Sequence, residues 1–252
     1  MNKSLLLPLA ILALSAFTSC SKFTNFLIHT VTEKEDLSNV APADTVTIEK
    51  KMAFKGTFSH IHTEGGYDIN LVQGDNAINF NGRKVYADNA ILKVSGDTLY
   101  ISSKEDRFSR GSYSISVPAI KSIFTAGASD INAENFQQSV AFSITTAGAS
   151  DIELKSSSFS DISIATSGAG DISVKSVLMH NLNLSTAGAG DIKLERITAD
   201  TIKSELSGAS ELVASGHCKD FICNLNGAGD INIDKLNVAN KNAKKVENAV
   251  NK

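Results

Sequence analysis

The chain has 252 residues, of which 42% are hydrophobic and 20% are charged, a balance typical of folded globular proteins. Its net charge of −3 is too small to predict binding to nucleic acid or to an anionic membrane surface. The chain has no Trp, four Tyr and four Arg, so few side chains are of the kinds that anchor a deep, specific ligand site.

Residues 1–19 have the three parts of a secretory signal peptide, and Cys20 follows them. Lys3 supplies the positive start, residues 5–14 form a short apolar run, and "FTSC" brings small residues up to the cysteine. The apolar run is shorter than the roughly 20 residues that span a bilayer. The pattern resembles a bacterial lipoprotein signal, and an ordinary cleaved signal is the alternative. We therefore predict that Cys20 is lipidated and that the lipid holds the protein to a membrane.

Residues 20–46 are polar and mixed in charge, and no apolar periodicity of useful length occurs there. This composition predicts a tether between the lipid and a folded domain. Residues 21–25 contain no acidic run, so the periplasmic face of an outer membrane and the cell surface both stay open as locations.

One four-residue motif, Gly-Ala-Ser/Gly-Asp/Glu, recurs six times at intervals of 19 to 21 residues. A fixed period of this size is typical of a solenoid, in which each repeat stacks on its neighbours. The glycines that open the motifs are Gly127, Gly148, Gly168, Gly188, Gly208 and Gly227. The acidic residues that close them are Asp130, Asp151, Asp171, Asp191, Glu211 and Asp230.

The residues between the motifs alternate between apolar and polar, which predicts short strands with one buried face. Each repeat would supply two or three strands and about one coil, and coils would stack in parallel at roughly 4.8 Å. The residues after the acids would then form one inward column. That column is Ile131, Ile152, Ile172, Ile192, Leu212 and Ile231. The sequence thus predicts an all-β, parallel β-helix-like solenoid with coils of about 20 residues, spanning residues 47–236.

The motif itself is predicted to form a corner of each coil. The first glycine would take a positive φ. The invariant Ala would suit a crowded corner, and the third position would need a small residue. The carboxylate would cap its own turn. A column of carboxylates could alternatively share cations such as calcium, which prefers six to eight oxygen ligands.

We call the series of six motifs the ladder. The sequence on both sides of the ladder is less regular. Residues 65–71 copy the corner, and Asp68 precedes Asp130 by 62 residues, which is close to three periods. This spacing predicts less regular coils before the ladder. Residues 237–252 are polar and are predicted to form a tail or a short cap over the last coil.

The order of these motifs resembles the putative auto-transporter adhesin, head GIN domain family of secreted bacterial proteins. The resemblance covers about residues 46–236 and depends on "YDINLVQGD" at 67–75, "SISVPAIKSIFTAGASDI" at 114–131 and the ladder. It implies a right-handed β-helix-like solenoid without a recognised catalytic set, and a role in adhesion. The family's usual Gly-Ser-Gly corner is Gly-Ala-Gly or Gly-Ala-Ser here.

Other chemistry-bearing residues are few. His60 and His62 would share one strand face, where two imidazoles could hold a metal, although outward surface histidines are the simpler interpretation. Cys218 and Cys223 fall near apolar columns and are predicted to be buried free thiols, with a disulfide as the alternative. No Gly-x-Ser-x-Gly elbow or phosphate loop occurs.

These observations predict a non-enzymatic, exported lipoprotein at the cell envelope, on the periplasmic or surface face of an outer membrane. It would act as an adhesion or interaction module, with envelope proteins or surface glycans as partners. We expect no nucleic-acid partner, catalytic residue, metal or cofactor. Two alternatives stay open: a glycan-active enzyme on a β-helix scaffold, and a structural or sensory envelope component that binds another protein.

Overall fold

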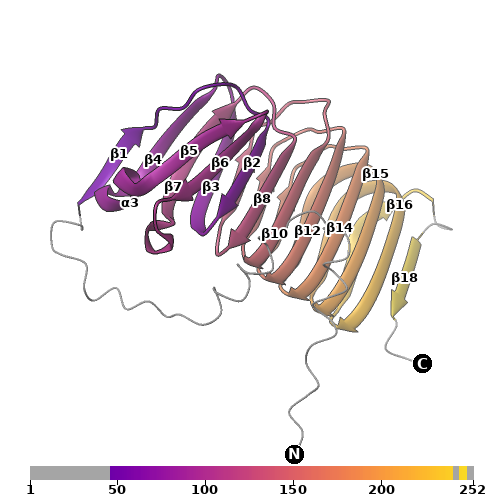
Figure 1. The fold of residues 1–252 in the computed structure, drawn as a ribbon. Helices are drawn as coiled ribbons and strands as arrows, with labels where there is room; N and C mark the ends of the chain where they lie inside the picture. Colours follow the sequence, from indigo (N-terminus) through magenta and orange to yellow (C-terminus); the bar gives the residue numbers. More distant parts are fainter. Residues whose placement is uncertain (1–45, 241–243, 249–252) are drawn as a thin grey trace, which may run out of the picture. The chain divides into compact units, whose positions relative to one another are not determined.

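A computed structural model describes residues 46–240 and 244–248 of the chain. Residues 1–45 lie outside the described residues, so the predicted signal peptide, the lipidated Cys20 and most of the predicted tether stay predictions. The described residues from 46 onward form β-strands joined in one 18-stranded sheet, with one α-helix and one 3-10 helix among them (Figure 1). The predicted all-β class is therefore confirmed.

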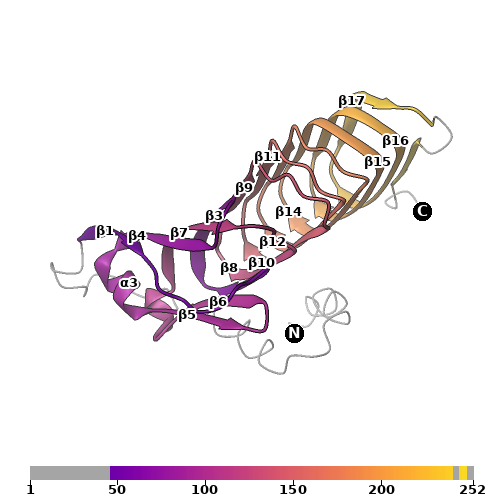
Figure 2. The same cartoon turned by 90° about the horizontal axis from the view of Figure 1, so that it is seen from above.

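The repeat region is a parallel β-solenoid. One wall consists of β8 (Ser122–Gly127), β10 (Phe142–Ala149), β12 (Asp161–Ala169), β14 (Asn181–Ala189), β15 (Ile192–Ala209) and β16 (Leu212–Ala228). A second wall consists of β9 (Ile131–Glu134), β11 (Ile152–Lys155), β13 (Ile172–Lys175), the first residues of β15 and β16, and β17 (Ile231–Val238). Figure 2 shows the coils stacked one behind another. Gly148 pairs with Gly168 and Gly168 with Gly188, so the register advances by one repeat per coil.

The predicted inward column is confirmed. Ile152 pairs with Ile131 on one side and with Ile172 on the other, and Ile172 pairs with Ile192. The column continues through Leu212 to Ile231 and, in the other direction, to Ile69. Most of these side chains are almost fully buried; Ile152, for example, is 1% exposed. Burial of this aliphatic column favours the stacking of the coils.

Each regular coil also has a second corner that the sequence pattern did not predict. Asn135, Ser156, Ser176 and Arg196 all have φ between 48° and 61°, and they follow one another at the repeat period. These residues end the second-wall strands, and the chain then turns into a short third wall of isolated parallel bridges. Asn and Ser tolerate the left-handed region better than most residues, but Arg196 does not belong to that group.

The prediction of less regular coils before the ladder is confirmed, but their order along the solenoid differs from their order in the sequence. The strands β2 (His60–Glu64) and β3 (Gly66–Gln73) pair directly with β8 and β9. On their other side they pair with β6 (Thr98–Ser103) and β7 (Arg110–Val117). The coil formed by residues 98–117 is therefore the outer neighbour of the coil formed by residues 60–73. The two coils are thus exchanged: the one that comes later in the sequence lies farther from the ladder. Sequence spacing could not reveal this exchanged order, because either side of a coil offers the same unpaired edge.

A cap closes the N-terminal end of the solenoid. It consists of β1 (Thr47–Lys51), β4 (Ala77–Arg83), α3 (Lys84–Asn89) and β5 (Ala90–Ser95), with the 3-10 helix η4 (Asp106–Phe108) nearby. The strands β4 and β5 pair antiparallel with β7 and β6, and β1 pairs antiparallel with β4. Such a change of strand direction covers the outermost coil and ends the parallel stacking.

At the other end, the strand β18 (Lys244–Asn248) pairs in parallel with β16. This strand lies within residues 237–252, and β17 also extends into that segment. The described residues of this segment therefore pair as strands with β16, and the predicted tail or cap over residues 237–252 stays a prediction.

Candidate functional site

The outward face of the first wall is a regular surface that extends over successive coils. Along β10 the buried residues alternate with partly exposed ones, and the same alternation recurs along β12 and β14. The outward residues lie in register from coil to coil, as Ser143–Ser163–Asn183 and Thr145–Ala165–Ser185. Because most of these side chains are small, this part of the face is flat and rich in hydroxyl and amide groups, and β15 continues the same rows with Lys203 and Glu205. We call it the polar face.

Three rings stand together at the N-terminal side of the polar face. His62 lies between Tyr100 and Phe124, with ring centroids 5.3 Å from Tyr100 and 4.7 Å from Phe124. Tyr100 lies on β6, His62 on β2 and Phe124 on β8. These strands are neighbours because β2 pairs with β6 on one side and with β8 on the other. Tyr100 is 40% exposed. The register thus assembles an amphipathic ring stack from residues that lie far apart in the sequence.

Polar groups surround these rings. The carboxylate of Asp97 accepts a hydrogen bond from the Ser59 hydroxyl at 3.2 Å and lies 3.4 Å from His60 Nε2. His60 Nδ1 lies 2.6 Å from the Ser122 hydroxyl. His62 Nε2 lies 3.2 Å from a Glu64 carboxylate oxygen. Both histidines are partly exposed, on the outward face of β2, so the interpretation as outward surface histidines is confirmed.

Sequence reasoning missed the ring stack. The alternation in "HIHTE" placed His60 and His62 on one face, but nothing in the sequence identified Tyr100 and Phe124 as their neighbours. The only available signal was an aromatic residue at an outward position of each strand. That signal is meaningful only when the order of the strands is known.

The repeated corner has a tight backbone. All six first glycines have positive φ, from 116° at Gly208 to 155° at Gly227. A Cβ on Gly168 would lie 2.0 Å from the carbonyl oxygen of Gly148, so the glycine column allows the backbones of successive coils to approach closely. The neighbouring Ala residues, such as Ala169 and Ala189, are exposed. The expectation that Ala is required because the corner is crowded is therefore wrong. The close contacts occur at the glycines.

Two acidic residues of the corner accept hydrogen bonds from the next coil, where the sequence predicts caps of their own turns. An Asp151 Oδ1 atom accepts a hydrogen bond from the backbone N–H of Asp171 at 2.8 Å. Asp171 accepts the corresponding bond from the N–H of Asp191, also at 2.8 Å. Each of these two carboxylates thus satisfies a backbone donor on the next coil.

The column of acidic residues continues into the preceding coil of the solenoid, where Asp68 lies beside Asp130. Burial, and then the charge of Asp130, raise the pKa of Asp68 above its ordinary value. The structure therefore places Asp68 next to Asp130 despite the 62 residues between them. Within residues 46–240 and 244–248, no three His, Cys, Asp or Glu side chains converge as the ligands of a metal ion would.

Cys218 and Cys223 are free and buried, which confirms the prediction of buried thiols. Burial raises the pKa of each thiol to about 11, and the charge of Asp220 adds to the effect at Cys218. Both side chains point into the core from β16. They act as small apolar residues of the repeat columns.

Two solved structures share this architecture. A putative adhesin from Bacteroides fragilis has 16% sequence identity and a TM-score of 0.62, and the match covers 81% of this chain and 97% of that one. A putative adhesin from Parabacteroides distasonis has 15% identity and a TM-score of 0.66, covering 75% of this chain and 82% of that one. At such low identity these structures show the fold alone. No curated protein matches the sequence.

The described part of the chain has no helix that is long and apolar enough to cross a membrane. The family model described as "putative auto-transporter adhesin, head GIN domain" matches residues 57–177 and 162–246. The matched residues include the exchanged coils, the glycine corners and the last coil, and they make up well over half of the chain. The chain belongs to the putative auto-transporter adhesin, head GIN domain family.

Proposed function

We propose that the protein is a non-enzymatic adhesion module, held to the outer membrane by a lipid on Cys20. The observation that carries this proposal is the polar face, where small hydroxyl and amide side chains repeat in register over the coils of β10, β12 and β14. A flat, repetitive surface makes many weak contacts rather than one deep one, and many weak contacts give avidity when the ligand also repeats. Surface glycans and fibrous envelope proteins are ligands of this kind.

The arrangement of acidic residues supports binding rather than catalysis. Glycan-cleaving enzymes generally need two carboxylates that face each other across the substrate. The ladder carboxylates instead run along the corner with one in each coil, and Asp151 and Asp171 are each engaged with a backbone N–H. The family description as adhesins is consistent with the same proposal.

Cells that display the full chain provide the test. We expect added protease to degrade the protein on intact cells, and we expect these cells to attach to immobilised polysaccharides or matrix proteins better than cells without it. Replacing the outward Ser163 and Ser185 by Arg should reduce attachment, because the bulky side chains break the flatness of the polar face. The matched control is Ser173→Arg, which lies on β13 in the second wall. Full protection from protease, or equal attachment of all variants, would contradict the proposal.

A further inference from the structure

The cap is rich in lysine, although the chain as a whole has a net negative charge. Residues 46–51 and 83–95 hold five cations and two anions, although the whole chain has a net charge of −3. The cations are Lys50, Lys51, Arg83, Lys84 and Lys93, and the anions are Glu49 and Asp88. Lys104 reaches the same place from the segment after β6. The cap is thus positive while the remainder of the chain is negative.

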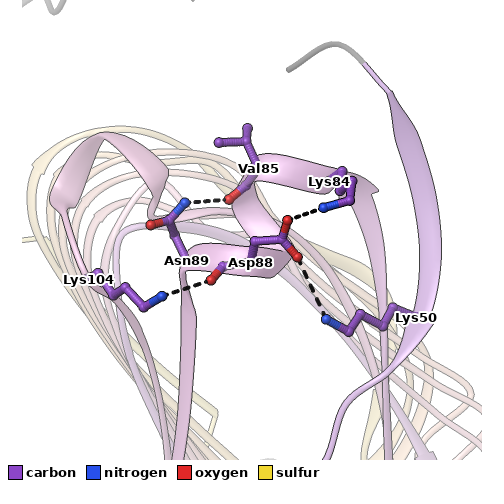
Figure 3. Close-up of polar contacts among 6 residues, drawn as sticks. All are labelled: Lys50, Lys84, Val85, Asp88, Asn89 and Lys104. Atoms are coloured by element: carbon purple, nitrogen blue, oxygen red, sulfur yellow. Dashed lines mark hydrogen bonds and ion pairs between the residues drawn. The ribbon is translucent and has the colours of Figure 1, made fainter. Parts of the chain in front are cut away.

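Three of these lysines converge on Asp88 (Figure 3). Lys84 Nζ forms an ion pair with one carboxylate oxygen, and Lys50 Nζ lies 3.8 Å from the other. Lys104 Nζ donates a hydrogen bond to the Asp88 backbone carbonyl at 3.1 Å. The hydrogen bond from Lys84, aided by the charges of Lys84, Lys50 and Lys104, lowers the pKa of Asp88 below its ordinary value. Asp88 therefore stays ionised, yet it neutralises only one of the three charges.

The lysine cluster is open to solvent and is fixed to the fold. The side chains of Lys50 and Lys84 are 47% and 56% exposed. The helix α3 that carries Lys84 packs on the fold through Ala87, which is 4% exposed. Like charges held this close repel one another, and an anion brought to the cluster relieves that repulsion.

The first described residue of the chain, Val46, lies beside this cluster. The backbone N–H of Lys84 donates a hydrogen bond to the carbonyl of Val46 at 2.7 Å, and Val46 is the first described residue. Everything before Val46, including Cys20, is therefore connected to the domain beside Lys84. Residues 21–45 contain two lysines and four acidic residues, so this segment does not itself supply positive charge.

We propose that the lysine cluster of Lys50, Lys84 and Lys104 is a docking face for a membrane surface with net negative charge. The occupant is the anionic headgroup layer of the membrane to which the tether leads. Clustered lysines attract such a layer as point charges, and the attraction decays within the Debye length of roughly 8 Å at physiological salt. Docking would set the cap against the membrane and leave the polar face free for a ligand. This inference rests on the membrane anchoring in the proposed function.

Vesicle binding tests the docking face without the lipid. The protein is the chain from residue 20 onward with Cys20→Ser, and the probes are phosphatidylcholine vesicles with and without phosphatidylglycerol. We expect binding only to the phosphatidylglycerol vesicles, and we expect high salt to abolish it. The triple variant K50Q/K84Q/K104Q should bind about 100-fold more weakly, or roughly fivefold per lysine.

The matched control is K155Q/K175Q/K193Q, which removes three exposed, ion-paired lysines from the coils. The control variant should bind as the parent chain does, and circular dichroism should show that both variants are folded. Equal binding by the parent and the cluster variant, or equal losses in both triple variants, would overturn the docking face. Failure of the attachment test on cells, with vesicle binding intact, would reject only the adhesion proposal.

Discussion

Gly188 lies directly beside Gly168 of the preceding coil, and a Cβ on Gly188 would lie 1.7 Å from the Gly168 carbonyl oxygen. The φ of Gly188 is 150°, which L side chains rarely adopt. Two independent constraints therefore require glycine at this position: its own dihedral angle and the backbone of the preceding coil. The same pair of constraints recurs at each first glycine of the corner, which explains why this residue does not vary among the six motifs.

Replacing Gly188 by Ala should lower the free energy of unfolding by more than about 2 kcal/mol, because the methyl group meets backbone rather than a movable side chain. Gly96→Ala is the matched control: Gly96 also has a positive φ, at 62°, but nothing lies within 4 Å of its added Cβ. That variant should lose only about 1 kcal/mol. Urea denaturation measures both changes, and equal losses would show that contact between coils is not the cause.

Shortening a residue of the inward column should be far more costly than shortening an exposed one. Ile152 is 1% exposed and Leu178 is 55% exposed. Ile152→Ala should cost about 3 kcal/mol through lost burial and a residual cavity, whereas Leu178→Ala should stay within about 0.5 kcal/mol. Thermal or urea denaturation of the two variants checks the difference. A small loss for Ile152→Ala would argue against a tightly packed column.

The Asp171 side chain should stabilise the stack through an acceptor atom rather than through its charge. Asp171→Asn retains an oxygen that can accept the Asp191 N–H, whereas Asp171→Ala leaves this donor without its partner. We expect Ala to cost about 1 kcal/mol and Asn to cost much less, since Asn also removes repulsion along the ladder. Equal costs for the two substitutions would contradict this account.

Calcium should not stabilise the ladder. The carboxylates of Asp151 and Asp171 are engaged with backbone donors, and calcium needs six to eight oxygen ligands. We expect the melting temperature to be the same in millimolar calcium and in EDTA. A rise in calcium that disappears in the variant Asp171→Asn would instead support shared cations along the corner.

Both core thiols should be unreactive in the folded protein near neutral pH. Burial raises the pKa of Cys218 and Cys223 to about 11, from an ordinary value of 9.0. Thiol reagents should therefore modify neither residue at pH 8, and they should modify both after unfolding in urea. Rapid modification of the native protein at pH 8 would contradict the burial of these side chains.

The same shifts predict a loss of stability in alkali. In the unfolded chain the thiols lose protons above pH 9, whereas in the folded chain they keep them until about pH 11. The folded state therefore binds more protons in this window, and the free energy of unfolding falls as the pH rises through it. The double variant Cys218→Ala/Cys223→Ala should show a weaker fall between pH 9 and pH 11 in denaturation experiments.

The repeating features could be predicted from the sequence because the chain contains six copies of one coil. Alternation identified the buried side of each strand, and the constant spacing placed Ile152 against Ile172. The recurrence of Gly168 and its equivalents likewise identified a corner that excludes side chains. These inferences are local: each depends on a residue and its own copy one period away.

The tertiary structure alone decided which coil lies beside which in the first half of the chain. There β2 lies between β6 and β8, and this order brings Tyr100, His62 and Phe124 together. It also gathers Lys50, Lys84 and Lys104 around one carboxylate in the cap. The physical reason is that every coil of a parallel stack has two similar edges. Only the competition among whole strands for these edges, together with the antiparallel strands that end the stack, selects one order.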